Sequence, residues 1–187
     1  MTIVGQSGSG KSTILQIFLG FCAYQGDIYI DNQNFNTIDS TQFRHQIAYL
    51  SQQTMLLPMS IADNLRLPDP TASDDKLWQI LAQVGLKPLI KALPNQLDTQ
   101  LGERGSGLSG GQQRRLAIAQ LLLQDAQLWL LDDPTEHLDS DTAAEINGLL
   151  QQVTRGKTVL WVTHDATNLP WLDRQISLDI ASTLAKV

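Results

Sequence analysis

A glycine-rich stretch near the beginning of the sequence has the residue types and spacing of a phosphate-binding loop. It reads G-x-x-x-x-G-K-S, and the residues that we expect to contact phosphate are Gly5, Gln6, Ser7, Gly8, Ser9, Gly10, Lys11, Ser12 and Thr13. Glycines let the backbone bend so that successive N–H groups and a helix N-terminus face phosphate oxygens. Lys11 would add a positive charge at the outer phosphates, and Ser12 would offer a hydroxyl to Mg²⁺. This stretch therefore predicts a site for a phosphorylated ligand and its metal.

Two adjacent carboxylates follow the apolar run 128–131. Asp132 would end a buried strand, where it could meet the phosphate-binding loop from the neighbouring strand and hold Mg²⁺ through water. Because adjacent residues at a strand end point in different directions, Asp133 can act separately as a base that polarises an attacking water. The two acids indicate phosphoryl-transfer chemistry, and a kinase or a GTPase would fit them as well as a nucleotide hydrolase.

A second anion-binding feature comprises Leu108, Ser109, Gly110, Gly111 and Gln112. The serine and the two glycines open a helical pattern that continues through residue 123, so N–H groups at this helix start would also face an anion. One chain thus carries two phosphate-facing helix ends.

Short apolar runs alternate with helical patterns along most of the chain. Strands are expected at 28–30, 47–50, 128–131 and 159–162, with the end of a strand at 2–4 and a last strand at 173–178. Helices are expected at 12–19, 77–84, 113–123 and 143–153. This alternation predicts an α/β fold with a mostly parallel sheet. Together with the phosphate-binding loop and the acids, it indicates a P-loop NTPase core. Because the stretch 58–108 has helix signals without a strand, we expect a core of residues 1–57 and 109–187 with a helical subdomain of residues 58–108 inserted in it.

The L-S-G-G-Q sequence at 108–112 resembles the signature of the ATP-binding-cassette (ABC) ATPases. In that family, the P-loop of one subunit and the signature of another enclose each ATP. The resemblance implies a fold of the ABC ATPase type, ATP and Mg²⁺ as ligands, and a second ABC nucleotide-binding subunit as partner, in a homodimer or a heterodimer.

Further motifs carry the same resemblance over residues 4–164. The sequence Y-L-S-Q at 49–52 is similar to the Q-loop, which implies that Gln52 contacts Mg²⁺ or the attacking water. E-H-L-D at 136–139 resembles the D-loop, so Asp139 would reach across the dimer, and V-T-H at 162–164 resembles the switch, so His164 would hold the γ-phosphate. L-G-E-R-G at 101–105 resembles a loop of exporter-type cassettes, in which Glu103 would touch the transmembrane domain of an exporter.

The stretches GFCAYQGDIYI and DDPTEHLD resemble subunits of bacterial heterodimeric exporters linked to cysteine and glutathione. This implies a thiol substrate and a place on the cytoplasmic face of the inner (plasma) membrane. The family usually has Glu where Asp133 stands, so we expect a slow, degenerate site in a heterodimer. The family also has strands and an adenine-stacking aromatic residue before the P-loop, so we expect an N-terminally truncated domain.

Composition limits the kinds of partner and function that remain possible. The chain has 187 residues and a formal charge of −6, and it has no long basic run, which disfavours nucleic acid as a partner. The single cysteine, Cys22, cannot form an internal disulfide, and we expect it to be buried. Two alternatives stay open: a structural partner that binds ATP with little hydrolysis, and an ABC ATPase without a transport role. The second is disfavoured, because the sequence has neither a long heptad insertion nor a tandem cassette.

Overall fold

The computed structural model describes residues 1–165, 167, 169 and 171–178, so the end of the predicted core segment 109–187 lies outside the described residues. The strands are β1 (Thr2–Gly5), β2 (Tyr29–Ile30), β3 (Gln33–Asn34), β4 (Ile47–Leu50), β5 (Leu128–Asp132), β6 (Thr158–Thr163) and β7 (Gln175–Leu178). The α-helices are α1 (Lys11–Phe18), α2 (Ser40–His45), α3 (Ile61–Arg66), α4 (Asp74–Gln83), α5 (Lys87–Ala92), α6 (Gly110–Leu123) and α7 (Ser140–Val153). Short 3-10 turns are η1 (Phe35–Thr37), η2 (Gln96–Asp98) and η3 (Glu103–Gly105).

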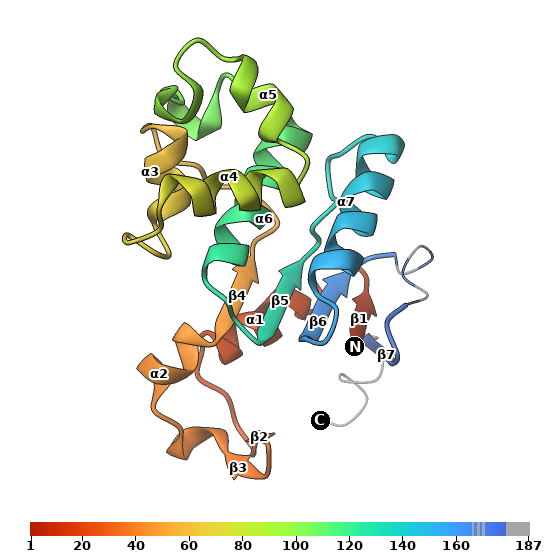
Figure 1. Ribbon diagram of the computed structural model, residues 1–187. Coiled ribbons are helices and arrows are strands. Elements are labelled where there is room, and N and C mark those ends of the chain that lie inside the picture. Colours follow the sequence, from red (N-terminus) through yellow and green to blue (C-terminus); the bar gives the residue numbers. More distant parts are fainter. Residues whose placement is uncertain (166, 168, 170, 179–187) are drawn as a thin grey trace.

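Five strands form one sheet in the order β4-β5-β6-β1-β7, and every neighbouring pair is parallel. Figure 1 shows the carboxyl ends of β4, β5, β6 and β1 at one edge of this sheet. The predicted α/β fold with a mostly parallel sheet is therefore confirmed. The strand expected at 28–30 is instead β2, which pairs with β3 in a separate antiparallel ribbon. The expectation that Asp132 lies on the strand next to the P-loop strand is wrong, because β6 lies between β5 and β1.

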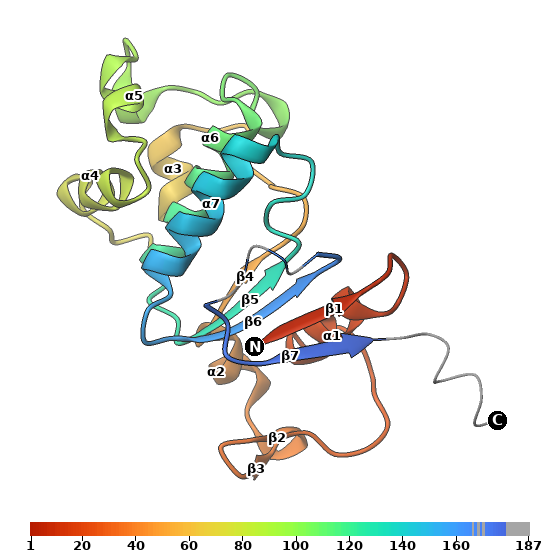
Figure 2. The ribbon, with the colours of Figure 1, turned by 90° about the vertical axis from the view of Figure 1, so that its right-hand side faces the viewer.

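Side chains that alternate along each strand fill two apolar layers, one on each face of the sheet. On one face, Leu130 and Leu160 pack with Leu15 of α1 and Phe43 of α2. On the other face, Trp129 and its neighbours pack against α6 and α7. Figure 2 shows α1 and the pair α6 and α7 on opposite sides of the strands. The sheet therefore has helices on both faces, as buried parallel strands require.

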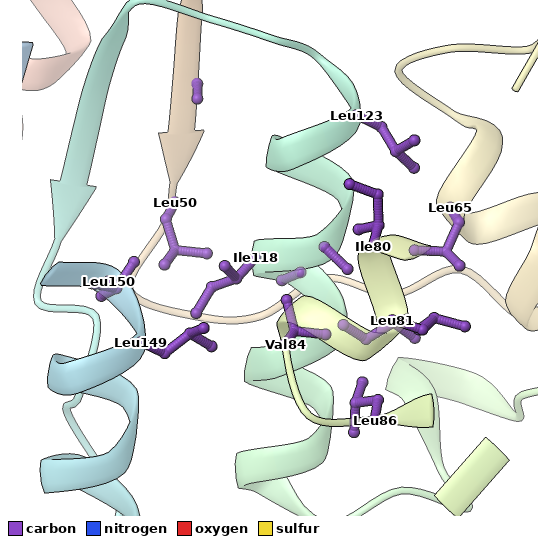
Figure 3. Packing of buried hydrophobic residues seen from close by; sticks show 14 of the residues in the cluster. Leu50, Leu65, Ile80, Leu81, Val84, Leu86, Ile118, Leu123, Leu149 and Leu150 are labelled. Atoms are coloured by element: carbon purple, nitrogen blue, oxygen red, sulfur yellow. The ribbon is translucent and has the colours of Figure 1, made fainter. Parts of the chain in front are cut away.

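The helices α3, α4 and α5 lie together at one end of the molecule, beyond the sheet (Figure 1). Their apolar side chains belong to the same cluster as residues of the sheet and of α6, for example Leu65 and Leu81 with Ile118 (Figure 3). The helical part is thus joined to the rest of the chain by a continuous apolar core. The division into a core and an inserted subdomain at residues 58–108 stays a prediction.

Local signals explain where several helices begin. Ser73 caps α4 by accepting from the Lys76 N–H, as its position before the apolar pattern predicts. The short helix α2 was not expected, although Asp39 caps it by accepting from the N–H groups of Thr41 and Gln42. The expectation of a buried Cys22 is wrong, because this residue is partly exposed after the turn that ends α1. Within the described residues, no helix is long and apolar enough to cross a membrane.

Candidate active site

The glycine-rich loop connects the end of β1 to the start of α1, as its motif predicts. Gly8 has φ of 81° and Gly10 has φ of 90°, left-handed values that a residue with a β-carbon rarely adopts. The Lys11 ammonium group donates to the carbonyl oxygens of Gly5 at 2.8 Å and Gln6 at 2.9 Å. The lysine charge is therefore held over the hollow of the loop, where an anion would bind.

Asp132 ends β5 and meets the loop across the intervening strand. The Ser12 hydroxyl donates to Asp132 Oδ1 at 2.9 Å, and the Tyr49 hydroxyl donates to Oδ2 at 3.3 Å. Burial raises the pKa of Asp132, while the hydrogen bonds from Ser12 and Tyr49 lower it, and burial raises the pKa of Tyr49 to about 12. A hydroxyl beside a carboxylate is an oxygen donor set that suits Mg²⁺, which usually takes few protein ligands and keeps water and phosphate oxygens. The residues present therefore fit this metal.

Asp133 follows directly and has φ of 40°, an unusual backbone conformation for a residue with a side chain. Its Oδ1 accepts from the Thr163 hydroxyl at 2.8 Å and lies 3.3 Å from His164 Nδ1. The carboxylate is thus bound at the end of β6, beside the predicted switch histidine. Strained backbone of this kind is common at functional sites, where the surrounding structure enforces it.

These residues surround one cavity of about 270 Å³ at the carboxyl edge of the sheet. Its lining consists of Ser7, Gly8, Gly10, Lys11, Ser12, Thr13, Gln52, Asp132, Asp133, Glu136 and His164. The structure therefore brings most of the predicted loop residues together with both acids, Gln52 and His164. Gly5, Gln6 and Ser9 complete the loop without lining the cavity.

Glu136 also lines this cavity, although sequence reasoning gave it no role of its own. It belongs to the turn between β5 and α7, and its carboxylate accepts a hydrogen bond from the Gln52 amide nitrogen. Nothing in the sequence indicates this contact, because Gln52 and Glu136 lie on separate loops whose approach depends on the fold.

Arg114 is a second residue that sequence reasoning missed. Its guanidinium is buried and donates to the carbonyl oxygens of Pro134 at 2.5 Å, Ser51 at 2.6 Å and Asp133 at 3.3 Å. It therefore connects α6 to the loops that follow β4 and β5. Burial lowers its pKa to about 10, which leaves the group charged at neutral pH. One pattern in the sequence pointed to it: Arg114 lies three and four positions before Ala117 and Ile118, so it shares one side of the helix with two buried apolar residues.

The signature residues begin α6, away from the residues that line the cavity. Ser109 caps the helix by accepting from the Gln112 N–H at 3.3 Å, and the Gln112 side chain accepts from the Ser109 N–H at 2.9 Å. A β-carbon on Gly111 would lie 2.6 Å from the Thr142 methyl group, so this glycine lets α6 and α7 approach closely. The structure thus places the second helix end outside the cavity formed by its own P-loop.

Two further predicted residues also lie outside the cavity. Asp139 caps α7, accepting from the Thr142 N–H at 3.0 Å and hydroxyl at 2.8 Å, and the hydrogen bond from the Thr142 N–H is the main cause of its lowered pKa. Glu103 begins η3 and is exposed. Their predicted roles toward a partner subunit and a membrane domain stay predictions.

Comparisons with known proteins show which family the chain resembles. The family model described as ABC transporter matches residues 1–136. The glutathione/L-cysteine transport system ATP-binding/permease protein CydC of Escherichia coli (strain K12) is 41% identical over 180 residues, covering 96% of this chain and 31% of that protein. The glutathione/L-cysteine transport system ATP-binding/permease protein CydD of Bacillus subtilis (strain 168) is 34% identical over 183 residues, covering 98% of this chain and 32% of that protein.

A solved structure described as a bacterial Atm1-family ABC exporter with ATP bound superimposes with a TM-score of 0.85 at 31% identity. The match covers 95% of this chain and 31% of that one. The chain thus spans about a third of the length of these relatives. The matched family, the parallel sheet and the P-loop that faces Asp132 lead to one conclusion: the chain belongs to the ABC transporter family, as an ATPase domain of the exporter type.

Proposed function

We propose that this chain binds Mg-ATP and hydrolyses it to power an exporter, as one of two nucleotide-binding subunits. The observation that carries the proposal is the hydrogen bond of 2.9 Å from Ser12 to Asp132. It joins the P-loop, inside the cavity, to the carboxylate that we expect to hold the metal. An isolated glycine-rich turn would have no reason to meet a buried carboxylate from a strand more than a hundred residues away.

Each residue of the cavity would have a separate role in binding and hydrolysing Mg-ATP. Lys11, which now donates to two loop carbonyls, would transfer its hydrogen bonds to the β- and γ-phosphates. Ser12 would hold Mg²⁺ directly, with Asp132 acting through water and Gln52 contributing its amide oxygen. When bound, the metal would neutralise charge on the phosphate oxygens. Asp133 would polarise the attacking water, and His164 would contact the γ-phosphate.

A second subunit completes this proposal. The signature residues 108–112 lie at a helix start outside the cavity, where they are available to the ATP of a partner. Asp139 lies at the start of α7 and would reach across the interface, and Glu103 would contact the transmembrane domain. The protein would then act on the cytoplasmic face of the membrane. The exporter relatives support a transport role over an ABC ATPase without one.

The more specific proposal is that this chain forms the slow ATP site of a heterodimer that exports a thiol. The name of the Escherichia coli relative, a glutathione and L-cysteine transport system, supports this substrate class. The slow site is supported by Asp133, whose short carboxylate is bound by Thr163 and lies beside His164. The same contact favours the alternative of an ATP-binding partner with little hydrolysis, because a base held at the wall of the cavity polarises water poorly.

Phosphate release from Mg-ATP, measured across a range of protein concentrations, tests the proposal. Turnover that rises faster than linearly with concentration and is lost in Lys11→Ala supports two chains enclosing ATP. ATP binding without turnover supports the alternative. Absence of both binding and turnover, in the protein together with its partner subunit, would overturn the proposed function.

A further inference from the structure

Glu136 places a third carboxylate at the cavity, with a longer side chain than either aspartate. Its N–H donates to the Asp133 carbonyl at 3.1 Å, which fixes the turn that follows β5. Glu136 lines the cavity together with Lys11, Ser12 and His164. A glutamate in this position is therefore held by the same turn that places Asp133.

The three carboxylates differ in what already binds them. Both oxygens of Asp132 accept hydrogen bonds, from Ser12 and from Tyr49, and Oδ1 of Asp133 accepts one from Thr163. Glu136 is the acid that contacts Gln52, the exposed residue just after β4. This contact joins the loop after β4 to the loop after β5 at the wall of the cavity.

The chemistry of this contact fixes the orientation of the Gln52 amide. An ionised carboxylate only accepts hydrogen bonds, so the amide nitrogen of Gln52 has to face Glu136. The amide oxygen then points away from Glu136 and is left for another ligand. Because Gln52 lines the cavity, this oxygen would be available to water or to a hard cation such as Mg²⁺, which carbonyl oxygens suit.

We propose that Glu136 is a positioning residue, which holds the Gln52 side chain with its amide oxygen presented to the metal and the attacking water. The inference rests on the proposed function, because it needs Mg-ATP in the cavity. Groups that orient a metal ligand without touching the metal commonly change metal affinity by about 10- to 100-fold when they are removed. Since Gln52 is exposed, we expect the lower end of that range.

The substitution that tests orientation rather than packing is Glu136→Gln. Glutamine keeps the size of the side chain but can both donate and accept, so it accommodates either orientation of the Gln52 amide. We expect the gain in ATP affinity on going from EDTA to Mg²⁺ to fall by about tenfold, while ATP affinity in EDTA stays unchanged. A matched control is Glu145→Gln, which makes the same chemical change on the exposed side of α7, where Glu145 pairs with Arg115.

The measurement is calorimetric titration of ATP with and without Mg²⁺, on the protein, Glu136→Gln, Gln52→Ala and the double variant. If Glu136 acts through Gln52, the double variant loses no more Mg²⁺-dependent affinity than Gln52→Ala alone. Additive losses, or a Glu136→Gln variant that matches Glu145→Gln, would overturn the inference while leaving the proposed function intact. If the unsubstituted protein binds no ATP in Mg²⁺, the proposed function fails, and the inference fails with it.

Discussion

Arg114→Met should destabilise the protein far more than an ordinary surface substitution. The guanidinium makes two short hydrogen bonds to backbone carbonyls, those of Pro134 at 2.5 Å and Ser51 at 2.6 Å. Hydrogen bonds from a charged group contribute about 1.5–3 kcal/mol each, so the two together contribute about 3–6 kcal/mol. Methionine would leave both carbonyls without this donor, although it also removes the need to bury a charge.

Burial of the guanidinium disfavours its charged form and lowers the pKa of Arg114 to about 10. Relief from this unfavourable burial offsets part of the loss, so we expect the free energy of unfolding to fall by about 3 kcal/mol. In a chain of this size, 1 kcal/mol shifts the melting temperature by about 2–4 °C, which gives a decrease of about 6–12 °C.

Urea denaturation followed by tryptophan fluorescence measures this change, because Trp129 and Trp161 are buried in the apolar core. Arg115→Met is the matched control, since it removes the same charge from the next position of α6. Arg115 donates to the Val84 carbonyl at 3.1 Å and pairs with the largely exposed Glu145, so about 1 kcal/mol is expected. An Arg114→Met protein that is no less stable than Arg115→Met would refute the reasoning.

Three other substitutions have expected outcomes. Lys11→Ala should weaken ATP binding by about 10- to 100-fold, measured by calorimetry, because charge-assisted hydrogen bonds to phosphate are lost. Trp129→Ala should lower the free energy of unfolding by about 3–5 kcal/mol in urea, since this side chain is fully buried; a loss below 1 kcal/mol would contradict the packing. Ser109→Ala should lower it by about 1 kcal/mol through loss of the α6 cap, and an unchanged midpoint would exclude that role.

The parts of the site that depend on local sequence could be predicted. The P-loop, the strand that ends at Asp132 and the helix after Ser109 each follow from a short pattern of residues, and the structure has all three. The strand order could not be predicted in the same way. Whether β6 lies between β1 and β5 depends on pairing between distant segments. The alternation of side chains within a single strand does not indicate which strands will be its neighbours.

Contacts between loops could not be predicted from the sequence either. Glu136 and Gln52 follow different strands, and only the placement of those strands as neighbours brings their side chains together. Arg114 differs, because helical spacing puts it on the same side of α6 as Ala117 and Ile118, and a charged residue beside buried apolar residues needs buried partners.

The position of β1 between β6 and β7 affects how the sheet is assembled. Thr2 pairs with Trp161 of β6 on one side and with Gln175 of β7 on the other, so both partners of β1 lie far along the sequence from it. During synthesis, β1 therefore stays without its neighbours until β6 and β7 have emerged. Pairing across such a sequence distance is slow and leaves unpaired strand edges exposed to aggregation. The P-loop, which directly follows β1, would then reach its binding-competent shape only after β6 and β7 have paired with β1.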